Sequence, residues 1–560
     1  MNTIPQETPP RLKTWVASGD PWIWMTGSAV SVSLIAVIGL LVLMTIRGMG
    51  HFWPSDILYT TYQDPHGTSS IIVGEQVDSE EVTAARVRDS GYQTAPGQIY
   101  LRRDLIKVGN REAFGQDFLW VWAERMGPVT YPKELLVLER REWGNFYGTL
   151  VAVKENGRLV ASGDAAWEEV QHRIERAHSL FATIHTIEKD EIGSINYAID
   201  RLRLKERRLV LEGQLTPEAM AALKADRTSY DAKYAVVQKR LSELYADIRR
   251  DSITMRMSTG QEQEIPLSKV VRAYRPNTMG FGEKIAFYCS KFWEFVADEP
   301  RESNTEGGIF PAIFGTVMMV IVMSILVMPF GVVAAVYLRE YAKQGVVTRL
   351  VRIAVNNLAG VPSVVYGVFG LGFFVYFLGV RIDQLFFAEA LPAPTFGTPG
   401  LLWSSIVLAL LTLPVVIVAT EEGLTRIPRS IREGSLALGA TQAETLWRVV
   451  LPMAAPGIMT GLILSVARAA GEVAPLMMVG VVKLAPSLPL DSNFPFLHLD
   501  RKFMHMGFHI YDVGFQSPNV EAARPLVYAT ALLLVVVVVV LNLAAIYFRN
   551  RLRERYRGAE

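Results

Sequence analysis

Residues 421–456 read EEGLTRIPRSIREGSLALGATQAETLWRVVLPMAAP, and they connect two long apolar stretches at about 400–420 and 456–482. A connection between packed helices usually has about 2–8 residues, whereas this one is longer than 30 residues. It is also amphipathic and carries helix start and stop signals. We therefore expect this loop to form a docking surface for another protein.

Local signals in the loop predict two short helices. The first begins at Arg429 or Ser430 and ends at Leu438, and Gly439 breaks the chain behind it. The second runs from Thr441 to about residue 450, and Glu444 stands three residues after Thr441, which is typical of a capping box. The second helix is expected to end at the prolines that follow it, Pro452 and Pro456.

Six stretches of the chain are apolar and long enough to cross a bilayer as helices, which takes about 20 residues each. They lie at about 22–46, 309–338, 356–380, 400–420, 456–482 and 525–548. Buried helices of a soluble protein are the alternative, but six such lengths with hardly any charges oppose it. The sequence thus predicts a polytopic membrane protein with an all-α membrane core.

Cations in the short loops predict the orientation of these helices, since such loops are enriched in Lys and Arg on the cytoplasmic side. Three segments share this enrichment, and they follow the second, fourth and sixth stretches: Arg339, Lys343, Arg349 and Arg352; Arg426, Arg429, Arg432 and Arg448; and Arg549, Arg551, Arg553, Arg555 and Arg557. Arg11 and Lys13 place the N-terminus on the same side. Both termini are therefore expected in the cytoplasm.

The same reasoning divides the chain and places residues 48–308 outside the cytoplasm as a large α+β insertion. We expect a β-rich part at about 60–160, a helical hairpin at about 164–250 and an interfacial helix at about 281–296. The remaining divisions are a cytoplasmic N-terminus at 1–21, a first membrane helix at 22–47, a core with five helices at 309–548 and a basic tail at 549–560.

Composition excludes several classes of protein. Among 560 residues, Lys+Arg number 56 and Asp+Glu 55, so the chain is no globally basic nucleic-acid binder. A single cysteine, Cys289, excludes a disulfide framework and a cysteine-based metal site. The sequence contains no phosphate-binding G-x-x-x-x-G-K-[ST] loop and none of the common hydrolase motifs, so we expect no catalytic residues and no cofactor.

His505 and His509 have the spacing that two metal ligands on one helical face need. His498 is the one possible third ligand nearby. We expect no metal there, and loop packing or a hydrogen bond explains these histidines better.

The loop also carries a family signature. Its residues follow the pattern EAA---G---------I-LP with the spacing intact: Glu433, Gly434, Ser435, Gly439, Val449, Leu451 and Pro452. The chain thereby resembles the permeases of ABC importers, although Gly434 and Ser435 replace the two alanines and Val449 replaces isoleucine. The resemblance implies the type I ABC importer permease fold, and a loop that couples to a separate ATPase chain.

Two further strings narrow the resemblance. ARAAGEVAPLM at 467–477 is similar to the AR-x-x-GETAPLL string of the PstA-type subunit of phosphate-specific importers, with Val473 in place of threonine, and LAGVPSVVYGVFG at 358–370 is similar to that family's third-span string. Arg468 and Glu472 are four residues apart in the expected fifth span, where ionisable residues usually have a function. They line the translocation path or only pair with each other, and both interpretations stay open. The resemblance covers about 281–548 and the first span, and it assigns no role to the 48–280 insertion.

The resemblance implies a set of partners in the inner membrane. They are a second, PstC-like permease in a heterodimer, two ATP-binding subunits, a periplasmic phosphate-binding protein, phosphate itself and membrane lipid. No nucleic acid is expected among the partners. Arg468 would then meet the charge of the anion, and Glu472 would hold its geometry or limit its affinity. A permease for another oxyanion, such as sulfate or molybdate, is the first alternative, and a membrane-anchored sensor is the second.

Overall fold

The computed structural model describes residues 15, 17–64, 67–89, 98–163, 165–517 and 520–557, so Arg11 and Lys13 lie outside the described residues. Among these, six helical segments are long and apolar enough to cross a membrane, as predicted. The first four are α2 (Asp20–Met49) with η1 (Gly50–Phe52), α9 (Phe310–Val336) with η7 (Tyr337–Tyr341), α11 (Ser363–Phe369) with η8 (Gly370–Gly379) and α12 (Val380–Phe386), and α13 (Leu401–Thr425). The last two are α15 (Gln442–Thr445) with η10 (Leu446–Val450) and α16 (Leu451–Ala470), and α19 (Val520–Arg557).

Two of the predicted spans have different bounds in the structure. The third begins at Ser363 and not near 356, because residues 346–358 form a separate helix, α10 (Val346–Leu358). Pro362 stands at the turn between them, where its ring disfavours helical geometry for the residue before it. The fifth span ends at Ala470 and not near 482, and a short helix, α17 (Leu476–Val479), follows it.

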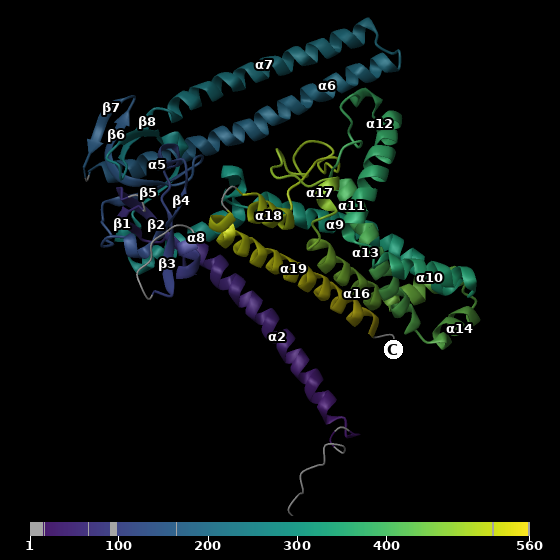
Figure 1. Cartoon of the computed structure of the whole chain (residues 1–560). Helices are drawn as coiled ribbons and strands as arrows, with labels where there is room; N and C mark the ends of the chain where they lie inside the picture. The colour runs from purple at the N-terminus through teal and green to yellow at the C-terminus, as the bar shows by residue number, and fades with distance from the viewer. Residues whose placement is uncertain are drawn as a thin grey trace, which may run out of the picture.

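Helix α13 forms the centre of the membrane core and is the most buried of the six spans. It packs between α9 and α16. Small residues allow the close approach of α16, since a Cβ added to Gly457 would lie 2.7 Å from Gly423 Cα of α13. Helix α2, by contrast, extends away from the core and contacts it through its last turn beside α19 (Figure 1).

Residues 57–274 contain two antiparallel sheets, so the chain as a whole is not all-α. The first sheet has the order β1-β2-β3-β4: Ile57–Gln63, Ser69–Thr83, Tyr100–Lys107 and Phe118–Trp122. The second has the order β10-β5-β6-β8-β9, with β7 also paired to β6: Val270–Tyr274, Leu135–Arg140, Phe146–Glu155, Asp251–Arg256, Glu262–Pro266 and Arg158–Ser162. The Asn156-Gly157 turn joins β6 to β7, and both residues have positive φ, as an Asn-Gly hairpin turn requires.

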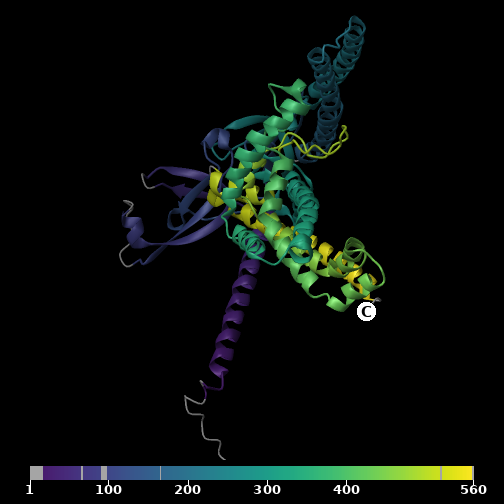
Figure 2. The same ribbon diagram turned by 90° about the vertical axis from the view of Figure 1, so that its right-hand side faces the viewer.

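A long helical hairpin is inserted into the second sheet between β7 and β8. It consists of α5 (Ala165–Thr186), the π-helical segment η3 (Ile187–Ile192), α6 (Gly193–Leu211) and α7 (Pro217–Ile248). Thr216 caps α7, because its Oγ1 accepts a hydrogen bond of 3.2 Å from the Ala219 N–H. The base of the hairpin packs on the sheet, and its far end reaches over the membrane core toward α12 (Figures 1 and 2). Helix α8 (Phe281–Ala297) leads from the sheets back to α9.

Candidate functional site

The 421–456 loop folds into the two predicted helical pieces. Helix α14 covers Arg429–Ala437, and Gly439 follows with φ of +90°, a conformation that favours glycine. The capping box of α15 is confirmed: Thr441 Oγ1 accepts from the Glu444 N–H at 3.2 Å, and Glu444 Oε2 accepts from the Thr441 N–H at 2.9 Å.

The prolines do not end the second helix, contrary to the prediction. Residues 442–470 form one helical segment that passes through Pro452 and Pro456. A π-helical turn, η10, lies directly before Pro452. Such a turn shifts the hydrogen-bond register and removes the clash that a proline ring makes with the preceding turn. The loop is therefore joined rigidly to the fifth span.

Two large apolar side chains of this loop are exposed to solvent. Leu438 and Trp447 are exposed to 91% and 71%, and Gly434 is exposed in the middle of α14. Of the other signature positions, Glu433 is exposed, while Ser435, Val449, Leu451 and Pro452 are half-buried. Val450, next to Val449, is the fully buried residue that faces the core. A leucine and a tryptophan that are both this exposed on one loop indicate a surface that another chain covers.

Arg432 anchors α14 to the membrane core, a role that no local sequence pattern predicts. Its Nη2 donates to Glu340 Oε1 and to the Leu424 carbonyl, both at 2.9 Å, and its Nη1 donates to the Ile427 carbonyl at 3.1 Å. A second contact supports the same helix, since Ser435 Oγ lies 2.9 Å from Thr445 Oγ1. The only sequence signal for the anchor is a cation directly before Glu433, the first residue of the signature.

Arg468 and Glu472 lie close together but not in one helix. Arg468 is in the last turn of α16, which ends at Ala470, and Glu472 lies just beyond that end. Arg468 Nε and Glu472 Oε1 are 3.8 Å apart, which is an ion pair but too long for a hydrogen bond. Arg468 donates no hydrogen bond to any other described residue. Its guanidinium is one-third exposed and keeps its donors free for another group.

The three histidines do not form a metal site. Within the described residues, no group of three or more His, Cys, Asp or Glu side chains could hold a metal ion. His498 Nε2 instead lies 2.9 Å from Asp491 Oδ1, and His505 Nδ1 accepts from the Gly507 N–H at 3.1 Å. His505 and His509 are fully buried, and burial lowers the pKa of each to about 4. Both are therefore neutral at pH 7, and both ring nitrogens of His509 lack a hydrogen-bond partner among the described residues.

The chain is similar to known membrane transport proteins. Residues 327–557 match the family model described as binding-protein-dependent transport system inner membrane component. The chain is 36% identical over 250 residues to phosphate transport system permease protein PstA 1 of Mycobacterium tuberculosis strain CDC 1551, covering 43% of this chain and 71% of that relative. It is 35% identical to phosphate transport system permease protein PstA of Mycobacterium leprae, covering 45% of this chain and 74% of that relative. A solved inward-facing structure of the MetNI methionine ABC transporter matches 43% of this chain and 94% of its own at 18% identity, with a TM-score of 0.31.

Proposed function

The chain belongs to the PstA-type permeases among the inner membrane components of binding-protein-dependent transport systems, and on that premise we propose that it carries inorganic phosphate through an ATP-driven importer. It is a multi-pass inner-membrane protein and a transport subunit, not an enzyme. ATP hydrolysis belongs to a separate chain. The structural observation that carries the ATP-driven coupling is the anchored loop with its exposed Leu438 and Trp447.

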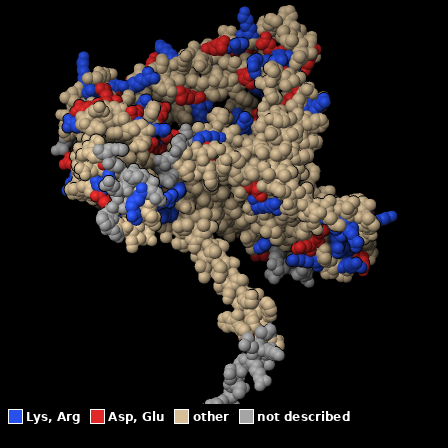
Figure 3. All heavy atoms as spheres, in the orientation of Figure 1, with Lys and Arg blue, Asp and Glu red and all other residues tan. Residues whose placement is uncertain are grey.

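In this proposal the 421–456 loop couples the permease to the ATP-binding subunit. Leu438 and Trp447 would be covered by the ATP-binding subunit, and Arg432 keeps α14 fixed to the core so that movement passes into it. The α14 end of the core is strongly charged, as blue spheres gather where α10 and α14 lie (Figure 3). That agrees with a cytoplasmic position for the loop and an extracytoplasmic one for residues 48–308. Two ATP-binding subunits and a PstC-like second permease complete the assembly, together with a periplasmic phosphate-binding protein.

Arg468 is proposed to meet phosphate on the translocation path. An arginine can bind a phosphate through two parallel hydrogen bonds, which a tight pairing with a carboxylate would prevent. The 3.8 Å separation from Glu472 leaves the guanidinium oriented without using its donors. Glu472 also limits the affinity, because a lone cation would release the anion slowly.

Uptake of radiolabelled phosphate into proteoliposomes with the whole co-purified complex tests the function. We expect ATP-dependent phosphate uptake that excess molybdate and sulfate do not reduce. Arg468→Gln should lower uptake by about 10- to 100-fold, the value of one or two charge-assisted hydrogen bonds. Arg203→Gln, an exposed arginine on α6, is the matched control and should transport normally. ATP-dependent uptake of molybdate and not of phosphate would contradict the proposed substrate. Normal phosphate uptake by Arg468→Gln would exclude the role of that charge.

A further inference from the structure

The far part of the helical hairpin contacts the membrane core at two places, both distant in sequence from the hairpin. Arg208 of α6 forms an ion pair and hydrogen bond with Glu389, and the Tyr197 hydroxyl of α6 donates to the Phe494 carbonyl. Glu389 lies in the short turn η9 (Ala388–Ala390), just after the third span, and Phe494 lies in the loop after the fifth span. One helix of the insertion thus joins two separate loops of the permease.

The contact with Glu389 is unlike an ordinary surface ion pair. The Glu389 side chain is only 10% exposed, whereas that of Arg208 is 54% exposed. A nearly buried carboxylate is costly without a cation, so Glu389 depends on the hairpin for its charge partner. Moving α6 away from this loop would leave the carboxylate unpaired, and the pair therefore resists separation.

The contact with Phe494 acts on a stiff loop. The Tyr197 ring packs edge-on against His498 at 6.1 Å, and His498 in turn contacts Asp491. Arg501 is 2.6 Å from Asp491 Oδ2 and also donates to the Leu488 carbonyl at 2.8 Å. The backbone of this loop is tied to the start of α13, because the Leu401 N–H donates to the Arg501 carbonyl at 2.9 Å. A displacement of α6 would therefore reach the outer end of α13.

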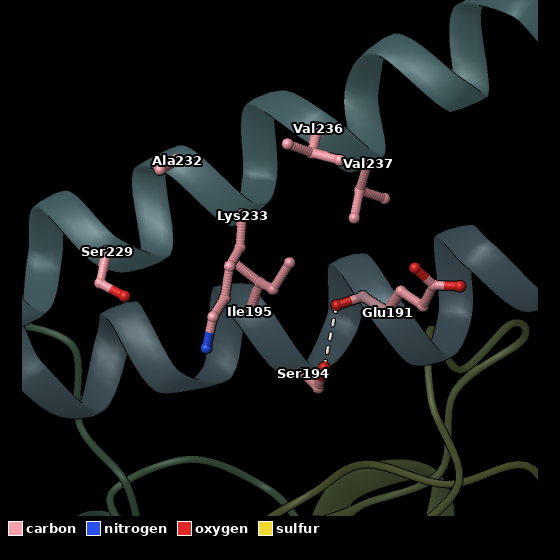
Figure 4. Close-up of a pocket in the computed structure, with 8 residues that line it drawn as sticks. All are labelled: Glu191, Ser194, Ile195, Ser229, Ala232, Lys233, Val236 and Val237. Carbon is pink, nitrogen blue, oxygen red and sulfur yellow. Dashed lines mark hydrogen bonds between the residues drawn. The ribbon is translucent and has the colours of Figure 1, made fainter.

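The hairpin has a firm base and a looser part beyond it. At the base, the Tyr245 hydroxyl donates to Glu188 Oε1 at 2.5 Å, and Arg240 lies 3.5 Å from Glu191. Farther out the helices leave an open groove of about 620 Å³ between them (Figure 4), lined by Glu191, Ser194, Ile195, Ser229, Ala232, Lys233, Val236 and Val237. The π-helical segment η3 lies at the inner end of this groove and contributes Glu191 to it, and helices kink at such segments. The outer part of the hairpin can therefore bend relative to its base.

We propose that the hairpin is an autoinhibitory strap across the outer face of the permease, and this rests on the transport function proposed above. In the present arrangement Arg208 and Tyr197 hold the end of the third span and the loop after the fifth span in place. Both contacts must separate when these outer segments move apart in the transport cycle. The strap thereby restrains ATP hydrolysis until the phosphate-loaded binding protein docks on the outer face.

Charge reversal tests the strap in the full complex. ATP hydrolysis is measured with and without the co-purified binding protein and inorganic phosphate, for Arg208→Glu, Glu389→Arg and the two together. Each single reversal should raise the basal rate by about five-fold or more, the lower end of typical coupling between sites. The double reversal should restore the low rate, because it rebuilds the pair with opposite polarity. Arg203→Glu, on the same helix but paired with Asp200, should behave like the wild type.

Wild-type basal rates in both single variants, with the complex assembled, would overturn the strap. A wild-type complex that hydrolyses ATP but does not respond to the loaded binding protein would contradict the proposed transport function instead. If a charge variant fails to assemble, spin labels on Leu211→Cys and Leu385→Cys, in a Cys289→Ser background, measure the hairpin directly. Both label positions are exposed. Their separation should increase when ATP and the loaded binding protein are added, and an unchanged separation would overturn the strap.

Discussion

The anchor of α14 provides the sharpest test of the coupling loop, and Arg432→Gln is the perturbation. Helix α14 has only nine residues, too few to be stable alone, so its position depends on tertiary contacts. Arg432 supplies three of these contacts, to Glu340 and to two backbone carbonyls. Glutamine keeps the polarity of the side chain but loses the charge and cannot reach all three acceptors.

The size of the effect follows from the burial of the pair. The side chains of Arg432 and Glu340 are 18% and 14% exposed, so the pair is largely shielded from water. Breaking a buried pair on one side costs about 3–5 kcal/mol, and the remaining exposure places this one at about 3 kcal/mol. If this loss falls on the docked position of α14, binding of the ATP-binding subunit weakens by about 100-fold.

The assay is the titration of purified ATP-binding subunit onto the permease in nanodiscs, with phosphate uptake measured in parallel. Arg429→Gln is the matched control, since Arg429 is exposed in the first turn of the same helix. Glu340→Gln and the double variant complete a mutant cycle, in which the two losses should be clearly less than additive. Equal affinity for Arg432→Gln and Arg429→Gln would refute the anchoring role, and strict additivity in the cycle would refute the pair.

Three further outcomes are expected. Gly439→Ala should weaken the coupling of ATP hydrolysis to uptake, because alanine at φ of +90° costs about 1–2 kcal/mol. The control, Gly434→Ala in the same motif, should be neutral or stabilising because Gly434 lies within a helix. Neither added Cβ meets another atom, so similar behaviour of the two variants would contradict the argument from the backbone conformation. Burial lowers the pKa of His505 and His509 to about 4, so the fold is most stable above pH 6.5, where both are neutral in the folded and unfolded chain. As the pH falls to 5, the free energy of unfolding should decrease by about 2 kcal/mol for each histidine. Melting temperatures in detergent at pH 7 and 5 measure this decrease, and the double variant His505→Asn with His509→Asn should reduce the difference between the two pH values. Trp447→Ala should lower the affinity for the ATP-binding subunit by at least ten-fold. The melting temperature of the isolated permease should stay the same, because the Trp447 side chain is exposed. A lower melting temperature would show that Trp447 packs inside the permease instead.

In the 48–308 insertion, local sequence patterns predict some strands of the second sheet but not the others. The β5, β6 and β7 strands follow from alternating β-formers and an Asn-Gly turn, which are signals within a few residues. Strands β8, β9 and β10 were not predicted, although they complete the same sheet after the hairpin. Strand β9 pairs with its neighbour β8, whereas β8 meets β6 and β10 meets β5, as in the pairs Thr149–Arg256 and Arg140–Val270. No local pattern indicates which distant strand β8 or β10 meets.

The same distinction applies to the site. The apolar lengths, the capping box of Thr441 and Glu444 and the break at Gly439 were determined by the sequence alone, because hydrophobic burial, capping and positive φ depend on neighbouring residues. Tertiary structure alone decided which charges far apart in the sequence are paired. Arg432 meets Glu340 across 92 positions, and Arg208 meets Glu389 across 181. Such pairs form only when packing brings their helices together and excludes water, and this information lies in the arrangement of the helices and not in any single one of them.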